Sequence, residues 1–67
     1  MKDFQERVLK EKDELQEKYE KLSKFIGSDK FHVLDNENQD LLLAQQGAMQ
    51  SYLVILMMRI NKFDLTD

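Results

Sequence analysis

The chain has 67 residues, a formal net charge of −3, one histidine and no cysteine. The missing cysteines exclude disulfides and thiolate metal sites, one histidine cannot form a metal cluster, and the mild acidity argues against binding duplex nucleic acid through its phosphates. A hydrophobic core of this size stabilises by only about 3–5 kcal/mol and usually needs disulfides, a metal or oligomerisation in support. We therefore expect a single domain, residues 1–67, that associates with other copies or with a partner.

The composition predicts an all-α protein. Charged residues make up 34% and apolar ones 42%, proline is absent, and glycine occurs only at positions 27 and 47, which is typical of a helical protein rather than a disordered one. No stretch approaches the roughly 20 apolar residues that span a bilayer, and the N-terminal segment lacks the apolar core of a signal peptide. We expect a cytoplasmic protein without a membrane partner.

Residues 3–26 are predicted to form the first long helix. Acidic and basic side chains surround an apolar stripe and form favourable pairs four residues apart, namely Glu6 with Lys10, Glu14 with Lys18 and Glu17 with Lys21. The stripe places Val8, Leu15 and Leu22 seven residues apart, and its companion row contains Phe4, Glu11, Lys18 and Phe25. Gly27 follows at the position where glycine commonly ends a helix.

The connector, residues 27–35, leads into a second long helix over about 36–62. Ser28 can cap a short helical turn that tucks Phe31 and Leu34 against the long helices, and Asp35 or Asn36 caps the second helix. Its stripe consists of Leu42, Met49, Leu56 and Phe63, with a companion row of Gln45, Tyr52 and Arg59. The predicted fold is an antiparallel helical hairpin with a short helical connector, assembled into a homo-oligomer.

The second helix contains six consecutive apolar residues, from Leu53 to Met58. They cover its whole circumference, of which one facing helix buries only about half. The excess favours a homo-oligomer whose interface contains Leu53, Leu56, Met57 and Ile60. A groove for a different protein is the alternative, whereas a membrane-surface helix would need a strongly cationic face that residues 40–62 lack.

Two cations fall in the predicted seams. A charge in a packing seam is costly unless it is partnered, so Lys18 and Arg59 suggest an anion held between helices or subunits. For Lys18 the alternative is a stem lying along apolar surface with its ammonium in water. For Arg59 the alternative is an interfacial ion pair, although its planar guanidinium suits phosphate well. Tyr52 is either a core-edge aromatic or a stacking surface for a nucleobase.

The sequence shows no arrangement of residues that is typical of a catalytic site. His32 lies in the connector, and periodicity brings no serine, cysteine or carboxylate pair to it. The two isolated glycines do not form a phosphate-binding loop. We expect neither enzymatic activity, nor a cofactor, nor a bound metal.

A set of residues in a fixed order resembles a known family, the phage anti-CBASS cyclic-nucleotide sponges, which share a helical-hairpin domain with the anti-Thoeris sponges. The resemblance extends from about residue 3 to 63, and its specificity lies in the order and spacing of the whole set. The set comprises Phe4-Gln5-Glu6-Arg7-Val8, Glu11-Lys12-Asp13-Glu14-Leu15, Lys18, Lys21-Leu22, Phe25-Ile26, Phe31, Leu34, Gln39, Leu42, Gln45, Met49, Tyr52, Ile55-Leu56 and Arg59-Ile60.

The resemblance implies a phage protein that sequesters immune second messengers without cleaving them. Members of that family are compact hexamers of hairpins, with cyclic dinucleotide pockets at dimer interfaces and cyclic trinucleotide pockets where three subunits meet. Carried over by position, Phe4 stacks on a base and Lys18 meets phosphate in the dinucleotide pocket, while Arg59 belongs to the trinucleotide pocket. Relatives often have tyrosine where this chain has Phe4, so stacking is carried over and a hydroxyl contact is not.

Two functions remain open from the sequence. The first is an oligomer that sequesters cyclic di- and trinucleotides. The second is a structural or adaptor coiled-coil module that binds a protein partner through its apolar second helix.

Overall fold

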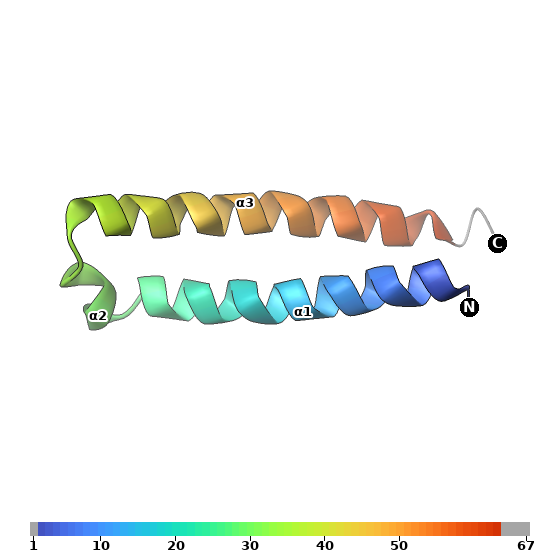
Figure 1. Cartoon of the computed structure of the whole chain (residues 1–67), viewed down its shortest axis with the longest axis horizontal. Helices are drawn as coiled ribbons and strands as arrows, with labels where there is room; N and C mark the ends of the chain where they lie inside the picture. The colour runs from blue at the N-terminus through green and yellow to red at the C-terminus, as the bar shows by residue number, and fades with distance from the viewer. Residues whose placement is uncertain (1, 64–67) are drawn as a thin grey trace.

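The computed structural model describes residues 2–63, which form two long helices and a short one (Figure 1). Helix α1 spans Asp3–Ile26, α2 spans Asp29–His32 and α3 spans Asn36–Asn61. No strand occurs among these residues, so the all-α prediction is confirmed for this part of the chain. The chain is long and thin, with extents of 49 × 14 × 14 Å.

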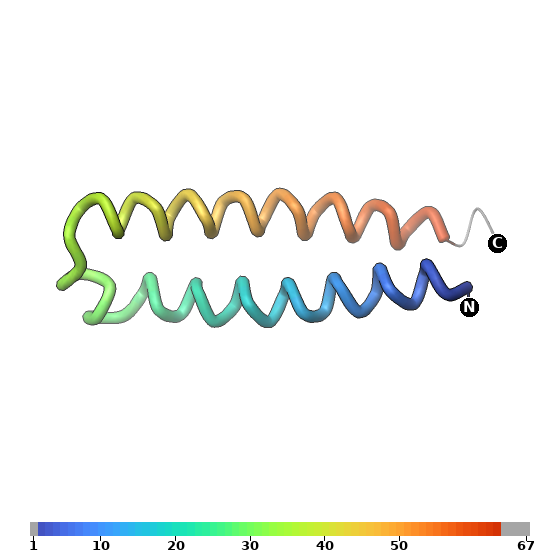
Figure 2. Tube along the Cα trace, viewed as in Figure 1, coloured from blue at the N-terminus to red at the C-terminus, as the bar shows by residue number. Residues whose placement is uncertain are grey.

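The two long helices run antiparallel and lie side by side along their whole length (Figure 2). They pack through a row of side chains that we call the hairpin seam. Val8 of α1 is buried opposite Leu53 and Leu56 of α3, and Leu56 is fully buried. Further along, half-buried residues continue the seam toward α2, namely Leu15 and Leu22 of α1 with Met49 and Leu42 of α3. The predicted apolar stripes therefore do face each other.

The companion rows differ from the prediction. On α3 the second row of the seam is Gln46, Leu53 and Ile60, four residues after each stripe position, whereas the predicted row of Gln45, Tyr52 and Arg59 is exposed. On α1 the second row contains Gln5, Lys12, Tyr19 and Ile26, while Phe4, Glu11 and Lys18 are exposed. Residues three and four positions along a helix flank the same stripe on opposite sides, and the facing helix covers one side only. Lys18 and Arg59 are thus outside the seam, which corrects the prediction.

Polar side chains inside the hairpin seam are hydrogen-bonded. Gln5 is fully buried, and its Oε1 accepts a hydrogen bond of 3.1 Å from the backbone N–H of Lys2. Gln46 of α3 donates from Nε2 to Ser23 Oγ of α1 at 3.0 Å. No buried side-chain nitrogen or oxygen among residues 2–63 lacks a hydrogen-bond partner. Because an unpaired buried polar group costs about 1–3 kcal/mol, these bonds make the glutamines compatible with a thin core.

The turn between the long helices is held by local side-chain bonds. Ser28 occupies the N-cap position of α2, but its hydroxyl donates to the Phe25 carbonyl at 2.6 Å instead of capping α2. Gly27 has φ −81°, so α1 ends there without the left-handed conformation that glycine permits. Asp35 is the cap of α3, because its carboxylate accepts from the Asn38 N–H at 3.0 Å.

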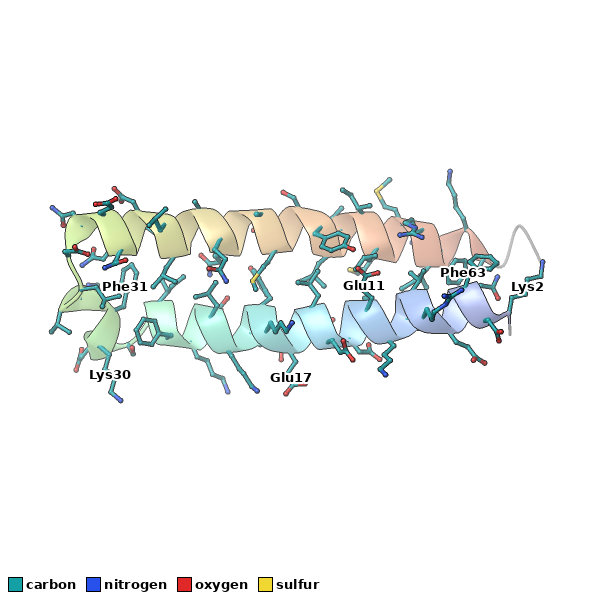
Figure 3. The ribbon with its side chains drawn as sticks, in the orientation of Figure 1. Lys2, Glu11, Glu17, Lys30, Phe31 and Phe63 are labelled. Atoms are coloured by element: carbon teal, nitrogen blue, oxygen red, sulfur yellow. The ribbon has the colours of Figure 1, made fainter. Side chains whose placement is uncertain are left out.

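Phe31 closes this end of the hairpin. Its ring is buried and meets the Phe25 ring edge to face, with centroids 6.4 Å apart, and Figure 3 shows it directed back toward the long helices. Leu34 is half-buried beside it. Gln39 donates from Nε2 to the Leu34 carbonyl at 2.8 Å and so ties α3 to the turn.

The outward side of α3 remains strongly apolar. Its exposed large apolar residues are Leu41, Leu43, Val54, Ile55, Met57 and Met58. By length and composition α3 is able to cross a membrane, alone among the helices of the described residues. This differs from the expectation that no stretch of the sequence is long and apolar enough to span a bilayer. Because α3 packs along its length against the charged helix α1, spanning a bilayer would require the hairpin to open.

The core is thin enough for one truncation to destabilise it strongly. Leu56→Ala removes a fully buried side chain, and we expect it to lower the free energy of unfolding by about 2–5 kcal/mol through lost burial and a residual cavity. Urea denaturation followed by circular dichroism measures this loss. Val33→Ala, at a site that is 83% exposed, is the matched control and should change stability by about 0.5 kcal/mol or less. Equal losses in the two variants would contradict this assignment of the core.

Candidate functional site

The exposed rows beside the hairpin seam form one surface, which we call the polar flank. It consists of Phe4, Glu11 and Lys18 of α1 with Gln45, Tyr52 and Arg59 of α3, each row spaced by seven residues. Residues seven apart recur on the same side of a helix, so the two rows run alongside each other down the hairpin. Sequence analysis singled out these rows, and the structure brings them together on the surface.

A hydrogen bond joins the two rows of the polar flank midway along the hairpin. The Tyr52 hydroxyl donates to the Glu11 carboxylate, and Figure 3 shows Glu11 between the two long helices. The bond to Glu11 raises the pKa of Tyr52 above its usual value, while the nearby positive charge of Arg59 acts in the opposite direction. Tyr52 remains 40% exposed, so its ring is accessible beside this bond.

Phe4 lies at the open end of the hairpin, where the N-terminus of α1 meets the end of α3. Its ring packs edge to face against Phe63, with the centroids 5.8 Å apart. It is still 47% exposed. A ring that is held at its edge and open elsewhere offers a surface on which a flat heterocycle can stack.

The structure does not bring Phe4 and Lys18 together within one chain. They are 14 residues apart on one continuous helix, which at 1.5 Å per residue corresponds to about 21 Å. A pocket for a small molecule has a volume of at most about 1,000 Å³ and is therefore roughly 10 Å across. A single compact ligand that contacts both side chains must take them from two different copies of the chain.

Arg59 lies near the open end, on the same flank as Phe4. It is four residues before Phe63, whose ring contacts Phe4, and side chains four apart on a helix are neighbours. Arg59 also lines a shallow hollow with Ile55, Met58 and Lys62. Lys62 was not predicted as a neighbour of Arg59, although its position three residues after Arg59 was a usable signal.

Both cations of the polar flank are exposed, and neither forms an ion pair with another described residue. Within residues 2–63, no carboxylate forms an ion pair with Lys18 or Arg59. Of the three predicted pairs on α1, the one that forms in this part of the chain joins Lys21 to Glu17 at 3.1 Å. The two alternatives for Arg59, an interfacial ion pair and an anionic ligand, therefore both remain open.

The other candidate features do not add chemistry to this surface. A second shallow hollow mixes acidic and basic side chains of α1, namely Asp3, Glu6, Arg7 and Lys10, and so does not favour an anion. His32 lies in α2, at the opposite end of the hairpin from Arg59, with its ring against Phe31. No group of three potential metal ligands occurs among the described residues.

The predicted interface residues divide into two groups. Leu53, Leu56 and Ile60 face α1 and belong to the hairpin seam. Met57 is 51% exposed and is available to another molecule. Participation of these four residues in an oligomer stays a prediction, and for the first three it would require contacts beyond those that they already make with α1.

The bond between Tyr52 and Glu11 predicts how the phenol titrates. Because a carboxylate that accepts the hydroxyl proton favours the neutral phenol, we expect Glu11→Gln to lower the pKa of Tyr52 toward its usual value. Ultraviolet titration in a Tyr19→Phe background isolates Tyr52, since the chain has two tyrosines. A raised pKa in the folded state means that the stabilisation is complete below the usual phenol range and declines as the pH rises through it. An unchanged titration curve in Glu11→Gln would show that the bond does not persist in solution.

Comparison with known proteins places this hairpin in a family. Residues 2–62 match the Sequestin family. The chain is also 43% identical over 60 residues to a protein of Enterobacteria phage T4, described as an uncharacterized 7.5 kDa protein in the denB-rIIB intergenic region, and the match covers 90% of this chain and 94% of the phage protein. No solved structure matches the chain. From the family match over nearly its whole length and this close phage relative, we conclude that the chain belongs to the Sequestin family.

Proposed function

We propose that this protein binds and sequesters cyclic oligonucleotide immune second messengers, both dinucleotides and trinucleotides, without cleaving them. Membership of the Sequestin family implies a sequestering role rather than catalysis. The phage relative supports a role during infection. We place that role in the cytoplasm of the infected bacterium, where these messengers serve antiviral systems such as CBASS.

The observation that carries the proposal is the composition of the polar flank. It presents an exposed ring, Phe4, and two cations that have no carboxylate partner within residues 2–63, Lys18 and Arg59. Cyclic oligonucleotides combine flat bases with phosphates in a closed ring. Aromatic rings stack on bases, and ammonium or guanidinium groups bind phosphate through charged hydrogen bonds. The side chains thus supply both kinds of contact, and no nucleophile or metal is needed for sequestration.

The separation of Phe4 from Lys18 supports a site shared between subunits. At about 21 Å apart on one straight helix, they contact the same dinucleotide only if one copy supplies the ring and another the ammonium. A two-fold axis through such a site presents Lys18 twice, once for each phosphate of a cyclic dinucleotide. A three-fold axis presents Arg59 three times to a cyclic trinucleotide. A hexamer with dihedral symmetry contains both kinds of axis, so sequestration and oligomerisation belong to one proposal.

An adaptor function is the second candidate, because α3 exposes an apolar surface that includes Val54, Ile55 and Met58. Such surfaces bind helices of other proteins. The two functions differ in their response to nucleotides. A ligand that binds only the folded oligomer raises its melting temperature, whereas an adaptor has no affinity for cyclic nucleotides.

Dinucleotide binding is expected to depend on both Phe4 and Lys18. Cyclic dinucleotides should raise the melting temperature of the unmodified protein, and calorimetry should show that Lys18→Ala and Phe4→Ala each weaken binding by about 1–3 kcal/mol, the scale of a charged hydrogen bond or a stacked base. Lys24→Ala is the matched control, because Lys24 is an exposed lysine of α1 outside the polar flank. Unchanged affinity in both flank variants would remove these residues from the site, and no thermal shift with any cyclic di- or trinucleotide would favour the adaptor.

Trinucleotide binding is expected to depend on Arg59 separately. Arg59→Ala should impair binding of cyclic trinucleotides while leaving dinucleotide affinity nearly intact, and Lys18→Ala should have the opposite selectivity. Arg59→Lys should recover little, because an ammonium cannot reproduce the bidentate fork of a guanidinium. Calorimetry with both ligand classes measures the selectivity. If Arg59→Ala lowers both affinities equally and also dissociates the oligomer in light scattering, Arg59 is an ion-pair residue between subunits.

A further inference from the structure

The face of α3 opposite α1 carries a second regular row of residues, which we call the outer seam. Its members are spaced alternately three and four residues apart, as in a coiled-coil interface. All are exposed in the single hairpin, and the three largest of them, Leu41, Ile55 and Met58, are between 52% and 60% exposed. The six residues are Leu41, Ala44, Ala48, Ser51, Ile55 and Met58.

The outer seam is shaped for close approach at its centre. Its middle residues, Ala44, Ala48 and Ser51, are small, and its large residues lie at the two ends. Gly47 borders the same face, and the position that a Cβ atom would occupy there has open space around it. Small residues allow two helix backbones to approach each other, and a large side chain packs best against a small one on the facing helix.

From this row we propose that a second copy of the chain packs on the outer seam with its α3 antiparallel to the first, around a two-fold axis between Ala48 and Ser51. In this arrangement every layer joins residues whose numbers add to 99. Leu41 meets Met58 of the second copy, Ala44 meets Ile55, and Ala48 meets Ser51. Ile55 thus faces the small Ala44 in two layers, and both ends of the interface are closed by a leucine and a methionine.

The charges on α3 favour the same orientation. No charged residue occurs from position 41 to position 58, so the interface buries no ion. Continuing the spacing of three and four residues beyond each end of the outer seam leads to Glu37 and to Lys62. Their numbers also add to 99, so the antiparallel pair places Glu37 of one copy beside Lys62 of the other at both ends. A parallel pair would oppose like charges, and it would set Ala44 against Ala44 and Ile55 against Ile55 instead of pairing the small residue with the large one.

The proposed interface would bury apolar surface that the single hairpin leaves exposed. The buried apolar core of the described residues consists of Val8, Phe31, Leu53 and Leu56, which is small for a chain of this length without disulfides or metals. Pairing through the outer seam places α3 between two helices, in agreement with an apolar surface on both of its sides. The two-fold axis also puts both polar flanks on the same face of the pair. The proposed contact itself needs no nucleotide and can be tested independently of the proposed function.

A charge at the centre of the outer seam tests the interface without disturbing the hairpin. Ala48 is exposed and does not contact α1 as part of the hairpin seam, so Ala48→Glu should keep its helical circular dichroism while the mass from light scattering falls by about half or more. Gln50→Glu, an exposed position outside the outer seam, is the matched control and should keep its assembly. Native mass in Ala48→Glu, equal dissociation of both variants, or a monomeric unmodified protein would overturn the proposal.

Introduced cysteines test the orientation, because the chain has no cysteine of its own. In the antiparallel pair Ala44→Cys of one copy faces Ile55→Cys of another, whereas two copies of either variant place their cysteines about 16 Å apart along the axis, beyond the roughly 7 Å limit for a disulfide. Mild oxidation of the mixture should give mainly the mixed disulfide by intact mass. Crosslinking of Ala44→Cys with itself would indicate a parallel pair, and a statistical mixture or no crosslink would also overturn the proposal.

Discussion

The packing of α1 against α3 is the contact on which the other surfaces of this protein depend. Two straight antiparallel helices meet along one seam. Once one row of each helix lies in that seam, every other seven-residue row of the helix must lie on the side or on the outside of the hairpin. Leu56 is fully buried by this contact. Once it faces α1, Tyr52 and Arg59 must lie on the side, and Ala48 and Ile55 must lie on the outside. The polar flank and the outer seam are thus consequences of one packing choice.

The same contact leaves much of the apolar surface of the single hairpin exposed. A two-helix seam buries few side chains, and here it includes Gln5 and Gln46, which need hydrogen bonds of their own. The apolar residues that a larger protein would place in its core lie on the outward side of α3. Burying apolar surface stabilises by about 25 cal/mol per Å², so covering that side with another copy adds to the stability that the seam provides.

The polar flank has the opposite character, because it keeps its charges in water. Lys18 and Arg59 are exposed and have no carboxylate partner within residues 2–63, and exposed cations incur little desolvation cost. Such groups are free to exchange water for phosphate. Their spacing along rigid helices is too large for one chain to surround a small ligand. The proposed binding therefore requires the proposed assembly, since only a second copy can bring a complementary side chain to the opposite face of the ligand.

Local sequence patterns were enough to predict the helices and their approximate ends. The seven-residue stripes, Gly27 and the two cap candidates Asp35 and Asn36 predicted two long helices and a short connector, and the observed helices are Asp3–Ile26, Asp29–His32 and Asn36–Asn61. The sequence also singled out Phe4, Lys18 and Arg59 as unusual side chains. These features depend on local propensity and periodicity, which a single helix expresses without a neighbour.

The packing of α1 against α3 selects which side of each stripe is buried. Rows three and four residues from a stripe flank it equally, and on α1 both rows mix polar and apolar side chains, so periodicity did not distinguish them. On α3 the row of Gln46, Leu53 and Ile60 is the more apolar, which was a signal that the sequence analysis did not use. The facing helix buries one row and leaves the other exposed. Lys18 and Arg59 belong to the exposed rows, so they lie on an accessible flank and not in the predicted seam. The joining of Glu11 to Tyr52 likewise required the chain to fold back, because residues 41 positions apart come together through long-range packing and not through helix geometry.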